Sequence, residues 1–335
     1  LVEDIVAGST APEPESYEVP TGPDGLPFGS DGDTASIMRL AGNLSGFPTS
    51  AGRVGRLYND TAETFRAMAA SIDTATHHVN ALYYQTSWDE YTAPFYEALE
   101  RAVARGVTVR LLVDHHGMRT IPGHKDFRRR LNNTGIEWHE MLPFAPLRGQ
   151  IRRPDLRNHR KILVIDGREA YVGSHNLVAP DYDTPSYTKA GMLYDDTSVS
   201  VTGPIVAQIQ AVFAVDWYYA CKQVLTPDVL TPPAAEVAAE REGEQASAMQ
   251  IIPSGPAFKG EPNLRAFIHM ISSARTHVSI TSPYFIPDEA LMTALTNAAL
   301  SGVTVELFVS EQLDQFLVGH AQRSYYGPLL KAGVR

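Results

Sequence analysis

The sequence predicts an α/β fold in which a mixed β-sheet is sandwiched by helices. Three observations support this prediction. Short β-rich runs alternate with amphipathic helical segments, a helix–glycine–strand pattern occurs twice, and a polar motif accompanies one predicted strand. Helices between short buried strands are typical of parallel or mixed sheets, because the connecting helices cover the sheet faces. We therefore expect one complete α/β module followed by the first part of a second.

Composition narrows the class of protein. The chain has 335 residues, of which 44% are hydrophobic, so it can bury a core in about two domains. The net charge of −10 argues against an extended nucleic-acid surface, which needs a basic footprint. No run approaches the roughly 18 consecutive apolar residues of a membrane span. The single cysteine, Cys221, excludes an internal disulfide.

The N-terminal part predicts little regular structure. Residues 1–50 are rich in Pro, Gly, Ser and acidic residues, which is typical of an extended, loosely held arm. Regular structure is expected to begin near Asp60, which forms a capping pair with Glu63 ahead of an amphipathic helix. The first module is predicted over residues 51–225.

The elements of this first module follow in alternation. We predict a strand at 78–85, a helix at 93–104, a buried strand at 107–113, a short helix ending at 132–135 and a closing helix at 204–224. Gly135 suits the left-handed conformation that commonly ends a helix. Residues 226–247, rich in Pro, Ala and Glu, predict a linker.

An internal repeat predicts the second module. The segment 98–114, ALERAVARGVTVRLLVD, aligns with 294–310, ALTNAALSGVTVELFVS. This alignment places Gly106 opposite Gly302, and other matching residues keep the same order at nearly the same offset. Two unrelated helix–glycine–strand units would not preserve such an offset, so we interpret the match as a repeat.

The repeat also predicts what the second module lacks. Gly135 and Gly333 match at the same offset, so the equivalent of His159 would fall beyond Arg335. Residues 248–335 therefore predict a truncated second module without a polar motif of its own.

The polar motif begins in LRNHRKILVIDG, at the start of a predicted strand. If residues 159–165 are extended, His159 and Lys161 lie on one face, because alternate side chains of a strand point the same way. Asp166 then belongs to the opposite face. One end of the strand thus carries an imidazole beside an ammonium group.

The motif continues after the strand returns through EAYVG. Gly173 allows a close approach of the backbone to a ligand, and Ser174 and Asn176 offer hydrogen-bond donors. Together with His159 and Lys161 these groups suit a phosphate ester. The imidazole can attack phosphorus or transfer a proton, while the cation and the amide stabilise charge on the phosphoryl oxygens.

The pattern His-x-Lys-x4-Asp-x6-Gly-Ser-x-Asn resembles the signature of the phospholipase D superfamily. Within it, the phrases RRPDLRNHRKILVIDG, ITSPYFIPDEAL and HAQRSYYGPLLKAGV are similar to those of the bacterial cardiolipin synthase family. The resemblance leaves only the N-terminal arm unmatched. It implies a phospholipase D-like fold in which two modules, each with one motif, meet at a pseudo-twofold axis.

The resemblance also implies roles for the motif residues. His159 would attack the phosphodiester of one phosphatidylglycerol, form a phosphatidyl-histidine and release glycerol. Lys161 and Asn176 would bind the phosphoryl oxygens, with support from Ser174. An acidic residue that orients the nucleophilic histidine in the family corresponds to Asp196.

The resemblance implies roles for two further residues, Asp166 and His320, and in each case another interpretation is open. Asp166 belongs to the catalytic signature, but strand alternation directs it away from His159, so we interpret it as a structural partner of the turn. His320 lies in VGHAQRSYYG, which is similar to a family phrase near the second site. It is a candidate substrate-binding residue, and the absence of any role in the pocket is equally open.

The family reaction is ping-pong and needs neither metal nor cofactor. A metal site is the alternative for Asp114, His115, His116 and His124, but their spacing matches no standard zinc pattern. The implied partners are phosphatidylglycerol and the membrane lipid surface, with no nucleic acid. The implied location is the bacterial cell membrane, with the catalytic part on the cytoplasmic side. We expect a C-terminal fragment or a second chain to supply the second motif.

Other functions stay open at this point. A phospholipase D-type hydrolase would use the same residues, with water in place of the second lipid. A superfamily nuclease is disfavoured by the repeat and the acidic charge. The isolated chain is also interpretable as an inactive half-enzyme that binds phosphate through Lys161 and Asn176.

Overall fold

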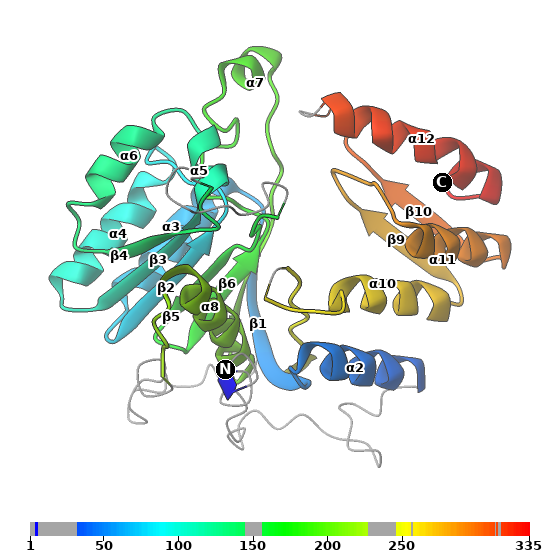
Figure 1. The fold of residues 1–335 in the computed structure, drawn as a ribbon, viewed down its shortest axis with the longest axis horizontal. Helices are drawn as coiled ribbons and strands as arrows, with labels where there is room; N and C mark the ends of the chain where they lie inside the picture. Colours follow the sequence, from blue (N-terminus) through cyan, green and yellow to red (C-terminus); the bar gives the residue numbers. More distant parts are fainter. Residues whose placement is uncertain are drawn as a thin grey trace.

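The computed structural model describes residues 4–5, 32–144, 156–226, 246–255, 257–311, 313 and 316–335. Figure 1 shows a large sheet with its helices beside a smaller body built on two strands. The predicted fold class is confirmed: the large sheet is mixed, and helices flank it. No helix in the described ranges combines the length and apolar character needed to cross a bilayer.

The large sheet has eight strands in the order β4-β3-β2-β5-β6-β7-β1-β8. Their bounds are β1 (Ser50–Tyr58), β2 (His78–Tyr83), β3 (Thr108–Asp114), β4 (Glu137–Met141), β5 (Ile162–Ile165), β6 (Glu169–Gly173), β7 (Ser198–Thr202) and β8 (Ser247–Met249). Strands β2, β3 and β4 are parallel to one another, and the remaining neighbours pair in antiparallel fashion.

Helices cover both faces of this sheet. They are α3 (Thr61–Asp73), α4 (Ala93–Ala104), α5 (His115–Thr120), α6 (His124–Leu131) and α8 (Ile205–Cys221). The short helix α7 (Pro185–Ala190) lies in the connection between β6 and β7, away from the sheet faces. The side chains of β5 alternate between two cores. Leu163 and Ile165 pack with α3 and α4, whereas Ile162 and Val164 pack with α8. This two-sided burial explains why β5 is apolar at every position.

Most predicted elements of this region are confirmed, with small shifts at their ends. Helix α4 and strand β6 have the predicted bounds, and β2, β3 and α8 differ by one to three residues. The predicted cap of α3 is present, because Asp60 Oδ1 accepts a hydrogen bond from the Glu63 amide at 2.7 Å. Most of the predicted linker, residues 227–245, lies outside the described residues.

The second body contains the parallel pair β9 (His277–Thr281) and β10 (Thr304–Phe308). Its helices are α10 (Pro262–Ser273), α11 (Glu289–Leu300) and α12 (Phe316–Ala332). Its register repeats that of the first body: Thr304 lies opposite His277, as Thr108 lies opposite His78. Both Gly106 and its counterpart Gly302 have positive φ, at 87° and 94°.

The repeat extends to the last residue. The Arg335 amide donates to the Val305 carbonyl at 2.9 Å, and the Leu307 amide donates to the Arg335 carbonyl at 2.8 Å. Arg335 thus takes the place beside β10 that β4 takes beside β3. This register supports the two-module interpretation, although β8, at the start of the predicted second module, belongs to the first sheet. The module boundaries therefore stay a prediction.

The predicted extended arm over residues 1–50 is wrong for its last part. Residues 32–45 form helix α2 (Gly32–Ser45), and β1 follows directly. The helix packs against α10, and Nη2 of Arg275, just after the end of α10, lies 2.5 Å from Asp33 Oδ2. The Pro- and Gly-rich composition of the whole segment concealed the short amphipathic stretch that forms this helix. Residues 6–31 lie outside the described residues.

Candidate active site

The motif lies at one edge of the large sheet, where β5 begins and β2 and β6 end. Ile162, the first residue of β5, pairs with Leu82 on one side and with Val172 on the other. Residues 158–161 therefore run beside the ends of both neighbouring strands. The antiparallel placement of β5 between β2 and β6 builds the site.

His159 and Lys161 lie on the same side of this segment. The rings of His159 and Tyr84 are stacked, with centroids 3.8 Å apart and an interplanar angle of 19°. Lys161 Nζ lies 5.7 Å from the centroid of the same tyrosine ring and donates to the His159 carbonyl at 2.6 Å. This is the arrangement that strand alternation predicts. His159 is exposed, so a substrate can reach its ring.

The residues on either side of His159 point the opposite way, to Asp216 on α8. Asn158 Nδ2 donates to Asp216 Oδ2 at 2.9 Å, and Arg160 Nη1 donates to the same oxygen at 2.6 Å. Burial raises the pKa of Asp216, and the contacts with Arg160 and Asn158 oppose that rise. One buried carboxylate thus anchors the backbone immediately before and after the imidazole.

Arg160 also contacts the segment that leads to the second body. Its Nη2 donates to the Ser254 carbonyl, and its guanidinium carbon lies 5.4 Å from the centroid of the Phe258 ring. Gly255 has a φ of 117°, and a Cβ there would lie 3.1 Å from Arg160 Nη2. A glycine at this position therefore lets the loop close over the guanidinium.

The electrostatic environment suits a nucleophilic imidazole. Partial removal from water, together with the adjacent Lys161 charge, lowers the pKa of His159 to about 4. Desolvation also lowers the pKa of Lys161 to about 8, and the carboxylate of Asp196 opposes this shift. At neutral pH the imidazole is unprotonated with a free lone pair, while the ammonium keeps most of its charge.

Asn176 and Ser174 lie next to this pair but already hold hydrogen bonds. Asn176 is buried, and its Nδ2 donates to the Tyr182 hydroxyl at 2.9 Å and to Gln85 Oε1 at 3.3 Å. Ser174 Oγ accepts from the Thr197 amide at 3.0 Å. Asn176 would bind a phosphoryl oxygen by exchanging one of its bonds, so its predicted role stays a prediction.

Asp196 carries its charge close to Lys161 and His175. It opposes the lowering of the pKa of both groups. His175 is itself buried, with Nδ1 2.9 Å from Ser198 Oγ. Within the described ranges no side chain hydrogen-bonds to the imidazole of His159, whose contact is the stacked Tyr84. A role for Asp196 in orienting His159 stays a prediction.

Asp166 is not brought to the site. It follows β5, whereas His159 precedes that strand, so the two residues lie at opposite ends. Asp166 is fully buried and accepts hydrogen bonds from the amides of Thr76, His77 and His78 at 2.8–2.9 Å. This geometry supports the structural interpretation and offers no support for proton transfer at His159.

The remaining candidates lie elsewhere. His320 is exposed on α12 of the second body, and its predicted substrate contact stays a prediction. Asp114 caps α5 by accepting from the amides of His116 and Gly117 at 2.9 and 3.0 Å. His115 Nδ1 lies 2.5 Å from a carboxylate oxygen of Glu140. No group of three potential metal ligands gathers in the part of the chain that the structure describes.

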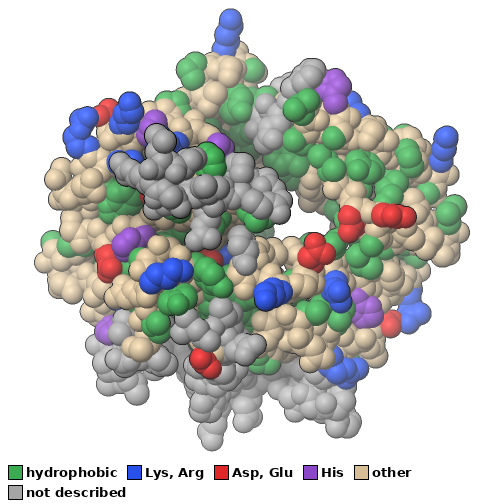
Figure 2. Space-filling view, viewed as in Figure 1, with side chains coloured by type: hydrophobic (Ala, Val, Ile, Leu, Met, Phe, Trp, Pro, Cys, Tyr) green, Lys and Arg blue, Asp and Glu red, His purple; other side chains and the backbone are tan. Residues whose placement is uncertain are grey.

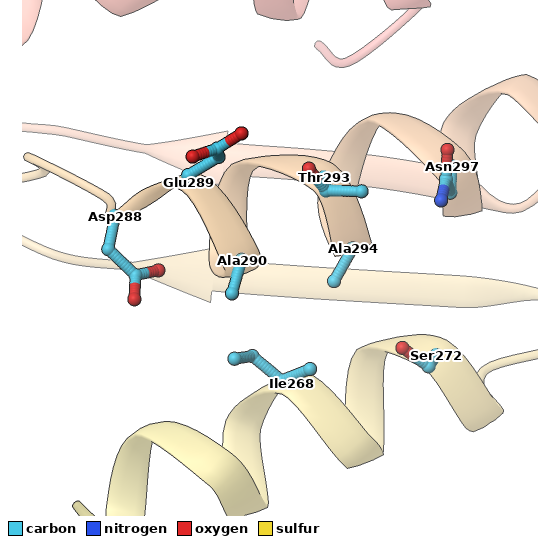
Figure 3. Close-up of a pocket in the computed structure, with 8 residues that line it drawn as sticks. All are labelled: Ile268, Ser272, Asp288, Glu289, Ala290, Thr293, Ala294 and Asn297. Atoms are coloured by element: carbon cyan, nitrogen blue, oxygen red, sulfur yellow. The ribbon is translucent and has the colours of Figure 1, made fainter.

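A hollow between α10 and α11 is separate from the motif. It is lined by Ile268, Ser272, Asp288, Glu289, Ala290, Thr293, Ala294 and Asn297 (Figure 3). Its charged lining groups are the carboxylates of Asp288 and Glu289, which would repel a phosphodiester. The hollow is therefore not a suitable site for the chemistry of the motif.

Sequence reasoning missed two residues of the site, Tyr84 and Asp216. Neither belongs to the motif, and each is brought to it by pairing between distant segments. Tyr84 follows β2, which lies beside β5, and Asp216 is on α8, which packs against the other face of β5. Only the strand order and the packing of α8 reveal them.

Comparison with known proteins gives a consistent picture. The family described as "Cardiolipin synthase, PLD-like domain" matches residues 68–217 and 267–335. Cardiolipin synthase of Geobacillus kaustophilus (strain HTA426) is 34% identical over 302 residues, which cover 89% of this chain and 57% of that protein. Cardiolipin synthase A of Erwinia tasmaniensis is 31% identical over 301 residues, which cover 90% of this chain and 60% of that protein. The chain thus spans less than two thirds of the length of these curated relatives.

A solved structure supports the fold. Phosphatidylserine synthase of Haemophilus influenzae Rd KW20 superposes with a TM-score of 0.57 at 14% identity, covering 88% of this chain and 72% of that one. At this level of identity the likeness concerns the fold alone.

Proposed function

The chain belongs to the cardiolipin synthase, PLD-like domain family, and from this premise we propose that it carries the first catalytic motif of a phosphatidyltransferase. The enzyme would make cardiolipin and glycerol from two molecules of phosphatidylglycerol. The observation that carries the proposal is the pair of His159 and Lys161, which share one side of an exposed sheet edge. Relatives named cardiolipin synthase supply the substrate class.

In the first half-reaction, a nitrogen of the His159 imidazole attacks phosphorus in one phosphatidylglycerol. A phosphorus–nitrogen bond forms, the bond to the glycerol oxygen breaks, and a general acid protonates that oxygen as glycerol leaves. The low pKa of His159 keeps its lone pair available at neutral pH. The ammonium of Lys161 stabilises the negative charge on the phosphoryl oxygens.

In the second half-reaction, a terminal hydroxyl of another phosphatidylglycerol attacks the phosphatidyl-histidine. A base removes the proton of that hydroxyl, the new phosphorus–oxygen bond forms, and the bond to His159 breaks. The product is cardiolipin, and the imidazole returns to its starting state. Positioning residues matter in both steps, and the stacking of Tyr84 and the anchoring by Asp216 hold the ring in place.

We further propose that a second motif supplies the general acid and base, from a C-terminal segment or another chain. The framework for such a motif exists in the second body. In the first body β5 pairs with β2, whereas the counterpart strand β9 pairs only with β10 among the described residues. A strand paired with β9 as β5 pairs with β2 would place its first residues at the equivalent edge.

Hydrolysis is the second candidate. The exposure of His159 favours it, because water can reach a phosphatidyl-histidine at this edge as easily as a lipid hydroxyl. The same first half-reaction would then end in phosphatidic acid. The isolated chain could also hold phosphate without turnover. Since the substrate is a lipid, we place the enzyme at the cell membrane, with this part on the cytoplasmic side.

The proposal is tested with phosphatidylglycerol vesicles and the longest form of the protein that carries this sequence. We expect cardiolipin and glycerol in equal amounts, with a covalent phosphatidyl group on His159. Mass spectrometry of peptides kept at alkaline pH would locate this label, since phosphorus–nitrogen bonds are labile in acid. Phosphatidic acid as the dominant product would favour the hydrolase, and a label absent from His159 would contradict the mechanism.

A further inference from the structure

Helices α5 and α6 concentrate basic side chains on an otherwise acidic protein. The basic residues are Arg119, Lys125, Arg128, Arg129 and Arg130, and the acidic residue of the segment is Asp126. The chain as a whole has a net charge of −10. Arg128 is engaged by Glu140 at 3.1 Å, but the Arg129 side chain is 76% exposed despite its contact with Asp126. Figure 2 shows Lys and Arg side chains gathered over these helices, at the upper left.

The connection between β6 and β7 ends in an apolar tip. Its residues 185–193, PSYTKAGML, contain one lysine and no acidic residue. Leu193 is 69% exposed, and Tyr187 and Met192 are partly exposed. In Figure 1 the tip, with α7, stands clear of the sheet at the top of the molecule.

Both elements are connected to the motif by hydrogen bonds. Gln85 Nε2 donates to Thr120 Oγ1 of α5 at 3.0 Å, and Gln85 itself contacts Asn176. Asn176 Nδ2 donates to the hydroxyl of Tyr182, whose ring packs against Tyr194 with centroids 4.4 Å apart at the base of the tip. The basic helices and the apolar tip therefore border the edge at which His159 is exposed.

The second body adds an apolar side chain at the same end of the molecule. Leu317, near the start of α12, is 80% exposed. Figure 1 places the start of this helix at the upper edge, level with α7. We define the docking rim as α5, α6, residues 185–193 and Leu317.

We propose that the docking rim binds the surface of an anionic lipid bilayer and presents the motif to lipid headgroups. This inference rests on the proposed function, because it assumes that the substrate is a lipid in a bilayer. The basic helices complement an anionic headgroup layer, and the tip supplies apolar groups that enter the acyl boundary. Stable surface binding commonly takes two such signals, because one alone gives only marginal attachment. In this orientation the phosphodiester of a lipid headgroup lies next to the sheet edge that carries His159 and Lys161.

The proposal is tested by co-sedimentation of the 335-residue chain with vesicles. We expect binding to vesicles that contain phosphatidylglycerol and little binding to pure phosphatidylcholine. The double variant Lys125→Glu, Arg129→Glu should lose affinity about tenfold or more at low salt, with a smaller loss at about 0.5 M salt. Leu193→Asp should weaken binding at every salt concentration. Lys331→Glu and Leu300→Asp, exposed positions outside the rim, are the matched controls and should bind like the original chain.

A second readout checks the contact itself. Leu193→Trp should show a blue-shifted emission on addition of phosphatidylglycerol vesicles, whereas Leu300→Trp should not. The proposal would be overturned if the rim variants bound vesicles like the original chain. It would also be overturned if the control variants lost as much vesicle affinity as the rim variants. Vesicle binding needs no turnover, so its result is separable from the proposed function. If the chain bound vesicles through the docking rim but formed no cardiolipin, the proposed function would be contradicted and the docking proposal would stand.

Discussion

The two bodies of the molecule share one structural pattern but differ in burial. All six residues of β2 are buried, whereas those of its counterpart β9 alternate between exposed and partly exposed. In the same way Leu111 of β3 is fully buried, and its counterpart Leu307 of β10 is only partly buried. The helix–glycine–strand unit thus folds alike in both places. Its neighbours, rather than its own sequence, decide how much of it is buried.

The comparison also separates the elements that both bodies contain from the elements that position the motif. Both bodies contain the parallel strand pair and its helices, but the described residues include the hairpin β5–β6 only in the first. His159 and Lys161 lie in the segment that leads into this hairpin, Asp166 and Gly173 lie within it, and Ser174 and Asn176 lie in the segment after it. The parallel pair is therefore common to both bodies, and the antiparallel hairpin beside it positions the motif residues in the first.

The largest expected effect concerns which body holds the nucleophile. His159→Ala should lower transfer by about a thousandfold or more, because in the proposed mechanism this imidazole takes up the phosphatidyl moiety. His277→Ala, in the exposed histidine that opens β9, should change transfer by about twofold or less. Cardiolipin formation from phosphatidylglycerol vesicles measures both. A comparable loss in the two variants would contradict the assignment of the chemistry to the first body.

The next effect tests the difference in burial. Leu111→Ala should lower the free energy of unfolding by about 3 kcal/mol, since the side chain is fully buried. Leu307→Ala should cost about 1 kcal/mol, because part of its surface is already in water. Urea denaturation of the two variants gives the comparison. Equal costs would mean that Leu307 is covered in solution by something beyond the described residues.

A smaller effect is expected from pH. In the proposed mechanism, transfer requires a neutral His159 and a charged Lys161, whose pKa values are lowered to about 4 and about 8. Activity should therefore fall as pH drops towards 4, where the imidazole gains a proton, and as pH rises above 8, where the ammonium loses one. Each limb approaches about a tenfold change per pH unit. In Lys161→Arg the alkaline fall should disappear, because guanidinium keeps its proton. An unchanged alkaline limb in this variant would exclude Lys161 as its origin.

The smallest expected effect tests whether the glycine turns of the two bodies are structurally equivalent. Gly106 and Gly302 have φ values of 87° and 94°, and a Cβ at either position would have open space. Gly106→Ala and Gly302→Ala should therefore each cost about 1 kcal/mol of stability, from backbone strain alone. Thermal unfolding measures both costs. A clear inequality would show that the two turns are not structural equivalents.

The parts of the structure that were predictable depend on local pattern. Alternation placed His159 and Lys161 together and directed Asp166 away, because the strand has a fixed period of two. Tyr84 and Asp216 escaped prediction because they reach the motif through strand order and helix packing, which no local pattern records. Helix α2 was missed for another reason: its few apolar residues lie within a segment whose overall composition is typical of disorder.

Arg160 connects the first body to the segment that leads to the second body. Its guanidinium is shared between the buried carboxylate of Asp216 and the carbonyl of Ser254. A hinge motion that pulled this group off Asp216 would strand a negative charge away from water, at a cost of several kcal/mol. The contact with Ser254 joins the same cation to a neutral carbonyl, so the segment that leads to the second body is held at Arg160 by a hydrogen bond to an uncharged group. The residue next to His159 therefore contacts both the buried core of the first body and the segment that leads to the second.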